Sequence, residues 1–229
     1  MGTHRPLFGG GKVYMASLYL ALLVGPALWP DALLGQPAGQ ASDEVRVGDR
    51  WVYDTKDEIT GFPKATYSHV VTEVSPKEIV VSVTFRGNNN SSVMVFDHNW
   101  NRLEQSNAKF KPNDGQGIRL PLAVGQGWRG EYEARATQTG VINAKASAVS
   151  KVVGQETVTT PAGTFETFKI ETRVQSINTA DPSQSSVYEN VGWFAPQVNH
   201  WVRRKSVTKI RNRMTQSFSE ELTDFSRNF

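Results

Sequence analysis

Apolar side chains recur at every second position over most of this chain beyond residue 45, and this period restricts its fold more than any other feature. In the segment 79–85, Ile79, Val81, Val83 and Phe85 alternate with smaller neighbours. The segment 168–174 has a similar pattern. Because successive side chains of a strand point to opposite faces of a sheet, each segment predicts a strand with one buried face.

The same reasoning extends to eight further segments, which turn-forming clusters of Gly, Pro, Asn and Asp separate. These segments are 50–54, 65–74, 92–96, 128–136, 141–152, 155–159, 186–194 and 201–213. About ten short strands joined by turns predict an all-β fold. Two architectures fit the pattern: an antiparallel sandwich and a curved, open-barrel-like sheet.

The C-terminal segment fits two structures. Ile210, Met214, Phe218 and Leu222 recur every four residues, which suits a helix stripe and also one face of a strand. A serine at position 217 with a glutamate three residues later would suit the cap of a short helix. Residues 214–229 are therefore left open between helix and strand.

A short motif occurs twice. Segments 47–51 and 124–128 both have the sequence Val-Gly-x-x-Trp, and a strand that carries a tyrosine follows each copy. A glycine turn that leads into tryptophan at a strand start predicts that the indoles of Trp51 and Trp128 pack in the core. The repeat also indicates a weak internal duplication of a β unit.

The N-terminal segment has the composition of a secretory signal peptide. Arg5 and Lys12 precede the uncharged apolar run 13–25. Gly39 and Ala41 supply the small residues that a signal peptidase requires. This pattern predicts an N-terminal signal helix with cleavage after Ala41.

Two organisations of the chain follow from that signal. In the first, residues 1–41 are removed and residues 42–229 form a single antiparallel β domain in the periplasm or outside the cell. In the second, residues 13–30 are retained as a membrane anchor, since their length is just below the roughly 20 residues that a spanning helix needs.

Composition and motifs exclude several classes of function. The chain has no cysteine, which excludes a disulfide framework, a thiolate metal site, a cysteine nucleophile and a cysteine-linked lipid. Its 25 basic and 22 acidic side chains nearly balance, so no general attraction to nucleic acid is expected. It also lacks the GxSxG and P-loop motifs.

No group of residues identifies a catalytic centre or a metal site. His69, His98 and His200 are far apart in sequence and lack zinc-ligand spacing, which predicts that they lie in turns or at the surface. We therefore expect no catalytic residue, no metal and no cofactor. An alternative is an envelope hydrolase that uses carboxylates such as Asp54 or Asp97, which requires two carboxyl groups about 5–10 Å apart across a cleft.

The most concentrated charge follows position 200. If 201–213 is one strand, its odd-numbered positions lie on one face and form a basic stripe. The stripe consists of Trp201, Arg203, Lys205, Lys209, Arg211 and Arg213. Such a surface would bind an anionic lipid, a glycan or an envelope protein. The alternative is a solvated face that prevents edge-to-edge pairing of strands.

Three segments together resemble a known group of proteins. They are 47–53, the run Pro161-Ala162-Gly163-Thr164-Phe165 within 158–167, and Gly192-Trp193-Phe194-Ala195-Pro196-Gln197-Val198 followed by Trp201-Val202-Arg203-Arg204. The chain thus resembles a broad group of exported, β-rich bacterial proteins of unknown function with a PAGTF turn and a WYAPxVG-type hairpin. The resemblance implies export and an antiparallel sheet, curved as in periplasmic lipoprotein and lipid carriers. It implies no catalytic residue.

These observations together predict an exported cell-envelope protein. We expect a non-enzymatic binding or assembly role for an apolar or anionic envelope ligand. The carboxylate-dependent hydrolase and a purely structural, partner-binding protein are the alternatives.

Overall fold

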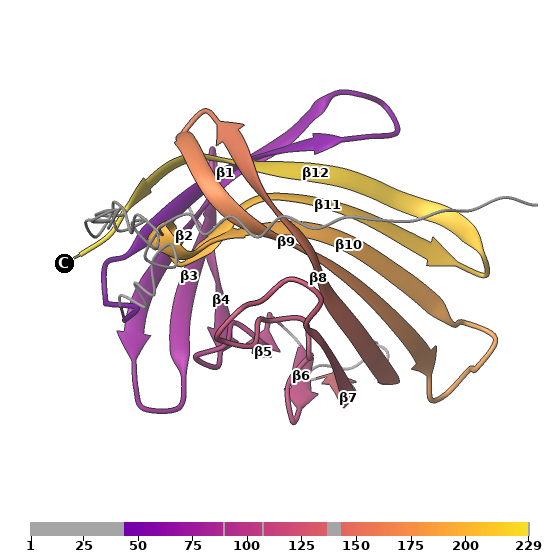
Figure 1. Ribbon diagram of the computed structural model, residues 1–229. Coiled ribbons are helices and arrows are strands. Elements are labelled where there is room, and N and C mark those ends of the chain that lie inside the picture. The colour runs from indigo at the N-terminus through magenta and orange to yellow at the C-terminus, as the bar shows by residue number, and fades with distance from the viewer. Residues whose placement is uncertain (1–43, 89, 107, 137–142, 229) are drawn as a thin grey trace, which may run out of the picture. The chain divides into compact units, whose positions relative to one another are not determined.

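The computed structural model of the protein describes residues 44–228, except 89, 107 and 137–142 (Figure 1). Within this part of the chain, twelve antiparallel strands close into one barrel. The strands are β1 (Arg50–Asp57), β2 (Pro63–Val74), β3 (Ile79–Phe85), β4 (Ser91–Phe96), β5 (Arg102–Gln105), β6 (Ala108–Lys111), β7 (Gly127–Ala136), β8 (Ala144–Thr160), β9 (Gly163–Asn178), β10 (Ser186–Ala195), β11 (His200–Ile210) and β12 (Arg213–Ser226). A 3-10 turn, η1 (Pro196–Val198), joins β10 to β11.

Each strand pairs with its neighbours in sequence, and β1 closes the barrel against β12. The predicted all-β antiparallel fold is confirmed, as a closed barrel rather than a sandwich. The sequence pattern missed β5 and β6, because each has only four residues and the sequences RLEQ and AKFK show little alternation. The predicted signal segment lies outside the described residues.

The segment 201–213 is not one strand, which corrects the prediction. β11 ends at Ile210 and β12 begins at Arg213. Arg211 and Asn212 between them have φ of 49° and 62°, and two successive residues of positive φ form a tight hairpin turn. The C-terminal segment, left open between helix and strand, forms β12 (Figure 1).

The PAGTF segment forms the tip of the β8–β9 hairpin, which has the two longest strands. Gly163 starts β9 with φ of 137°, a conformation that favours glycine. Phe165 is buried, with its ring centroid 5.9 Å from that of Phe225 on β12. The N–H of Ala162 donates to the carbonyl of Leu222, 3.3 Å away. The hairpin tip is therefore packed against β12.

The repeated Val-Gly-x-x-Trp motif forms the same turn twice. The N–H of Gly48 donates to the carbonyl of Val71 at 2.8 Å, and that of Gly125 donates to Val152 at 2.8 Å. The N–H of Val71 donates back to the carbonyl of Asp49, and the N–H of Val152 donates back to the carbonyl of Gln126, both at 2.9 Å. The indoles that follow, on Trp51 and Trp128, are 0% and 8% exposed, so their predicted burial is confirmed.

Candidate functional site

The barrel contains a cavity of about 360 Å³. Strands β1–β5 and β10–β12 and the loops around positions 100 and 115 contribute its wall. Its apolar side chains include Val83, Phe85, Met94, Phe96, Trp100 and Phe218, and its polar ones include Tyr67, His69, Arg102, Asp114, Arg204 and Glu220. Small-molecule sites typically have volumes of about 300–1,000 Å³ and a mostly apolar wall with a few polar groups. The cavity has the size and composition of such a site.

Aromatic rings close the barrel at the end where β1 and β11 begin. The ring centroid of His200 lies 4.6 Å from that of Trp51 and 4.6 Å from that of Trp100. Trp51 also packs edge-on against Trp100 and donates its indole N–H to the carbonyl of Val198, at 3.0 Å. Trp100 and His200 line the cavity, so this cluster forms its floor.

The lining residues become exposed toward the opposite end, where β2 begins and β3 ends. Lys64 is exposed there, and Phe85 is 42% exposed. The Lys64 ammonium lies 5.6 Å from the ring centroid of Phe218, which also lines the cavity. We take this end as the mouth of the cavity.

A buried carboxylate links three strands of the wall. Glu220 on β12 forms an ion pair with Arg204 on β11 and accepts a hydrogen bond from the Tyr67 hydroxyl on β2. Burial and the charge of Glu220 raise the pKa of Tyr67 well above its usual value, so its phenol stays protonated. Burial lowers the pKa of Arg204, but the charge of Glu220 and the neighbouring Tyr67, Tyr188 and Tyr53 together outweigh burial, so the pKa is raised overall. Arg204 therefore keeps its positive charge beside Glu220.

Two histidines lie inside the barrel, which corrects their predicted positions in turns or at the surface. His69 and His200 are each 4% exposed, and their ring centroids are 5.7 Å apart. Burial lowers the pKa of His69 to about 3, with a further contribution from Arg204, and burial lowers that of His200 well below its usual value. Both rings are uncharged at neutral pH. His98 is exposed as predicted.

The hydrogen bonds of the two buried histidines differ. The Tyr53 hydroxyl donates to the carbonyl of Trp201 at 2.8 Å and lies 2.6 Å from Nδ1 of His200. Since the phenol has one proton, Nδ1 of His200 must be the donor in the second bond, and its Nε2 is left as an acceptor. Nδ1 of His69 is buried and has no hydrogen-bond partner among the described residues.

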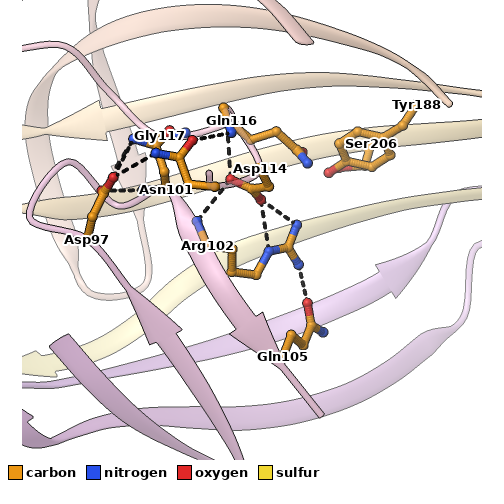
Figure 2. Close-up of polar contacts among 11 residues, drawn as sticks. Asp97, Asn101, Arg102, Gln105, Asp114, Gln116, Gly117, Tyr188 and Ser206 are labelled. Carbon is orange, nitrogen blue, oxygen red and sulfur yellow. Dashed lines mark hydrogen bonds and ion pairs between the residues drawn. The ribbon is translucent and has the colours of Figure 1, made fainter. Parts of the chain in front are cut away.

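A second ion pair, between Arg102 and Asp114, lies in the wall beside the β4–β5 loop (Figure 2). Asp114 accepts hydrogen bonds from the guanidinium Nε and from the backbone N–H of Arg102, both at 2.9 Å. Arg102 also donates to the side chain of Gln105. Asp97 accepts three hydrogen bonds from the backbone and side-chain N–H groups of Asn101, and these bonds hold the turn that contains Trp100. The arginine is thus oriented by groups of its own wall.

Uncharged polar side chains continue the wall on β10 and β11. The hydroxyl of Tyr188 lies 2.9 Å from that of Ser206 (Figure 2). Ser206 donates in turn to the amide oxygen of Asn190, at 3.1 Å. Most polar groups in this interior therefore have partners within the protein. Among the described lining residues, Nδ1 of His69 is a buried atom with neither a hydrogen bond nor an ion pair, whereas Nε of Arg204 is paired with Glu220.

The predicted basic stripe begins with two residues in different environments. Trp201 is 5% exposed and lines the cavity. Arg203 donates to Glu221 at 2.7 Å and to the carbonyl of Thr159, at the β8–β9 tip, at 2.8 Å. Trp201 is therefore separated from the cations with which it was grouped.

The rest of the stripe lies along β11 and the turn after it. Lys209 forms an ion pair with Glu189 at 2.8 Å. Lys205, Arg211 and Arg213 are exposed, and Arg213 belongs to β12 instead of β11. The structure thus leaves these three cations available at the surface.

Neither carboxylate proposed for a hydrolase lines the cavity. Asp54 is exposed and accepts a hydrogen bond from Thr66 at 2.5 Å, and Asp97 holds the loop described above. Among the described residues, no three His, Asp or Glu side chains gather in a way that would hold a metal ion. That part of the chain also contains no helix with the length and apolarity to span a bilayer.

Residues 114–217 match the DUF3108-like family model. This segment includes β7 to β11. No curated protein is significantly similar to the chain in sequence.

Solved structures resemble the fold. The crystal structure of a candidate lipoprotein from Parabacteroides distasonis aligns with a TM-score of 0.54 and 13% identity, over 79% of this chain and 96% of the other. A candidate exported protein from Bacteroides fragilis with a YmcC-like fold gives 0.48 and 16%, over 80% and 97%. The hypothetical lipoprotein YmcC from Escherichia coli gives 0.45 and 12%, over 80% and 90%. The predicted resemblance to uncharacterised β-rich proteins is thus confirmed at the level of a family match and a shared fold.

The sequence contained a signal for part of the polar wall that the prediction did not use. Tyr67 and His69 share parity with Val71 in the segment 65–74, so all three point to the buried face. A polar side chain at an inward position of a predicted strand is a candidate for a ligand site. Glu220 shares parity with Phe218 and Leu222 in the same way, but nothing in the sequence indicated that it would lie opposite Tyr67 and His69.

Proposed function

We propose that the protein is an exported cell-envelope protein that holds a small amphipathic molecule inside its barrel without transforming it. The observation that carries this proposal is the cavity of about 360 Å³, with its aromatic floor, mixed wall and exposed mouth. A cavity of this size inside a closed barrel suits storage or transfer of a small ligand more than assembly with a large partner.

The composition of residues 1–41 supports export, as does the fold shared with the candidate lipoprotein of Parabacteroides distasonis. These 229 residues contain no cysteine, so the proposed export does not involve a cysteine-linked lipid.

The charges of the cavity favour binding over hydrolysis. Its two buried carboxylates, Asp114 and Glu220, are each paired with an arginine. Carboxylates that act as general acid and base in glycoside hydrolysis face each other across the substrate with shifted pKa values. Each carboxylate of this cavity is instead held by an arginine of the same wall.

The exposed cations of the basic stripe are the basis of a separate proposal, that Lys205, Arg211 and Arg213 attract an anionic lipid, glycan or envelope protein. Glutamine at all three positions should weaken binding to anionic vesicles and leave the unfolding midpoint unchanged. Equal vesicle binding before and after the change would reject these residues as a site.

Native mass spectrometry of the protein purified from the envelope fraction of a bacterial host tests the main proposal. We expect a chain that begins at residue 42 with a non-covalent small-molecule adduct. Ala65→Trp should abolish the adduct, because Ala65 lines the cavity. Thr66→Trp is the matched control, since adjacent residues of a strand point to opposite faces.

An adduct that survives Ala65→Trp would place the ligand outside the cavity and reject the proposal. A bare chain in every preparation would favour the structural, partner-binding role. An uncleaved chain would favour the retained anchor over 13–30.

A further inference from the structure

We propose that the inner part of the cavity takes an uncharged hydroxyl group of the ligand and holds it beside His69. This inference rests on the proposed function and names its ligand class: a neutral, hydroxyl-bearing amphiphile whose apolar part lies against the aromatic wall. Three observations on described residues carry it, namely the charge balance of the wall, the unpartnered histidine, and the distribution of apolar side chains.

The charges of the inner wall cancel. Arg204 is paired with Glu220 and Arg102 with Asp114, all four within the cavity lining. A carboxylate or ammonium group placed between them would have to break one of these pairs, and separation of a buried ion pair is strongly unfavourable. Among the described lining residues, Lys64 is the charged side chain that forms no ion pair, and it is exposed at the mouth. The inner part therefore favours an uncharged group.

His69 supplies the complementary hydrogen-bonding group. Its ring lines the cavity, is 4% exposed, and has Nδ1 without a partner among the described residues. A buried polar atom that lacks a hydrogen bond is unfavourable, so a ligand that completes the bond gains affinity. Because that Nδ1 makes no hydrogen bond within the protein, no bond at this atom determines which tautomer the neutral ring adopts. A hydroxyl both donates and accepts, so it fits either tautomer.

The apolar part of the ligand has a defined path. Phe85, Met94 and Phe96 line the same cavity on β3 and β4, and Phe85 lies at the mouth. A hydroxyl beside His69 would therefore direct an alkyl chain along these side chains toward the mouth. His200 is less suited to the hydroxyl, because its Nδ1 is already bonded to Tyr53 and its Nε2 can only accept, which fixes a single hydrogen-bond direction.

The experiment compares three probes of equal chain length: octanol, octanoate and octane. Dissociation constants are measured at pH 7.5 with the full mature chain, from the fluorescence of Trp100 and its neighbours in the floor. Octanol is expected to bind at least about tenfold more tightly than octanoate. Octanoate is charged at this pH, and its carboxylate would find no unpaired cation in the inner part of the cavity. His69→Phe should weaken octanol about 3- to 10-fold, the value of one neutral hydrogen bond, and leave octane unchanged. His98→Phe is the matched control and should change neither.

Tighter binding of octanoate than of octanol would overturn the inference, as would octanol binding that His69→Phe leaves intact. Absence of octanol binding would also overturn it, whereas the proposed function is judged separately by the adduct and its loss in Ala65→Trp. If His69→Phe fails to fold, ¹⁵N NMR of the wild-type ring nitrogens replaces it. Octanol should then shift the His69 nitrogens and not those of His98, and an unchanged His69 signal would reject the inference.

Discussion

Replacement of Trp51 by alanine tests whether the aromatic floor holds the closed end of the barrel together. Trp51 is fully buried, packs against Trp100 and His200, and donates its N–H to Val198 in η1. Removal of a buried tryptophan side chain lowers the free energy of unfolding by about 3–5 kcal/mol. Trp51→Phe retains part of the ring and deprives the Val198 carbonyl of its donor, for which we expect a loss of about 1–3 kcal/mol.

The assay is equilibrium unfolding in urea followed by far-UV circular dichroism, because each substitution changes the tryptophan fluorescence itself. The result is read as a shift of the midpoint at unchanged slope. Trp128→Ala provides the comparison, since Trp128 follows the second copy of the turn and is 8% exposed. A loss below about 1 kcal/mol for Trp51→Ala would refute the packing role of the floor. Equal losses for alanine and phenylalanine would show that the hydrogen bond outweighs the packing.

Three further perturbations test the wall. His69 has a pKa of about 3 in the fold against 6.5 for the ordinary side chain, so the unfolded state takes up a proton first and stability should fall as the pH drops from 6.5 toward 3. Urea midpoints across this range should show the fall, and His69→Phe should reduce it. Glu220→Gln leaves the charge of Arg204, whose side chain is 27% exposed, without its partner, and should lower the free energy of unfolding by about 2–4 kcal/mol. The Glu220→Gln/Arg204→Gln double variant should recover part of this loss. Gly192→Ala would place a methyl carbon 2.6 Å from the Trp201 ring, so we expect a loss of about 1–3 kcal/mol in the same assay and altered tryptophan fluorescence.

The strands that could be predicted from sequence are those with one clearly apolar face. In β3 the buried residues are Ile79, Val81 and Val83, and the alternation is visible without any structure. In β5 and β6 it is hidden, because a strand of four residues samples each face only twice. Closure of the barrel was not predictable either, since the pairing of β1 with β12 depends on the number and tilt of all the strands between them.

The candidate site was less predictable than the fold because its interactions join distant parts of the chain. Tyr67 and Glu220 are 153 positions apart and meet only when the barrel closes. A pattern search within one segment finds no partner for either residue. His69 and His200 were wrongly predicted to lie in turns or at the surface for the same reason. The prediction considered only their spacing in sequence, whereas their burial depends on strands from elsewhere in the chain.

The motifs on which the resemblance rests consist of residues that pack the barrel. The residues that would select a ligand line the cavity and are mostly different ones. Phe165 fixes the β8–β9 tip against β12, and Gly192 leaves room for the indole of Trp201. The DUF3108-like match ends at residue 217, whereas much of the cavity wall comes from β1–β5 and from β12 beyond that point. Proteins that share the motifs can therefore share the barrel and still line its interior differently. It follows that differences in ligand among such barrels should depend on inward positions such as Tyr67, His69 and Glu220, and should be transferable by exchange of those side chains without changes in the motifs.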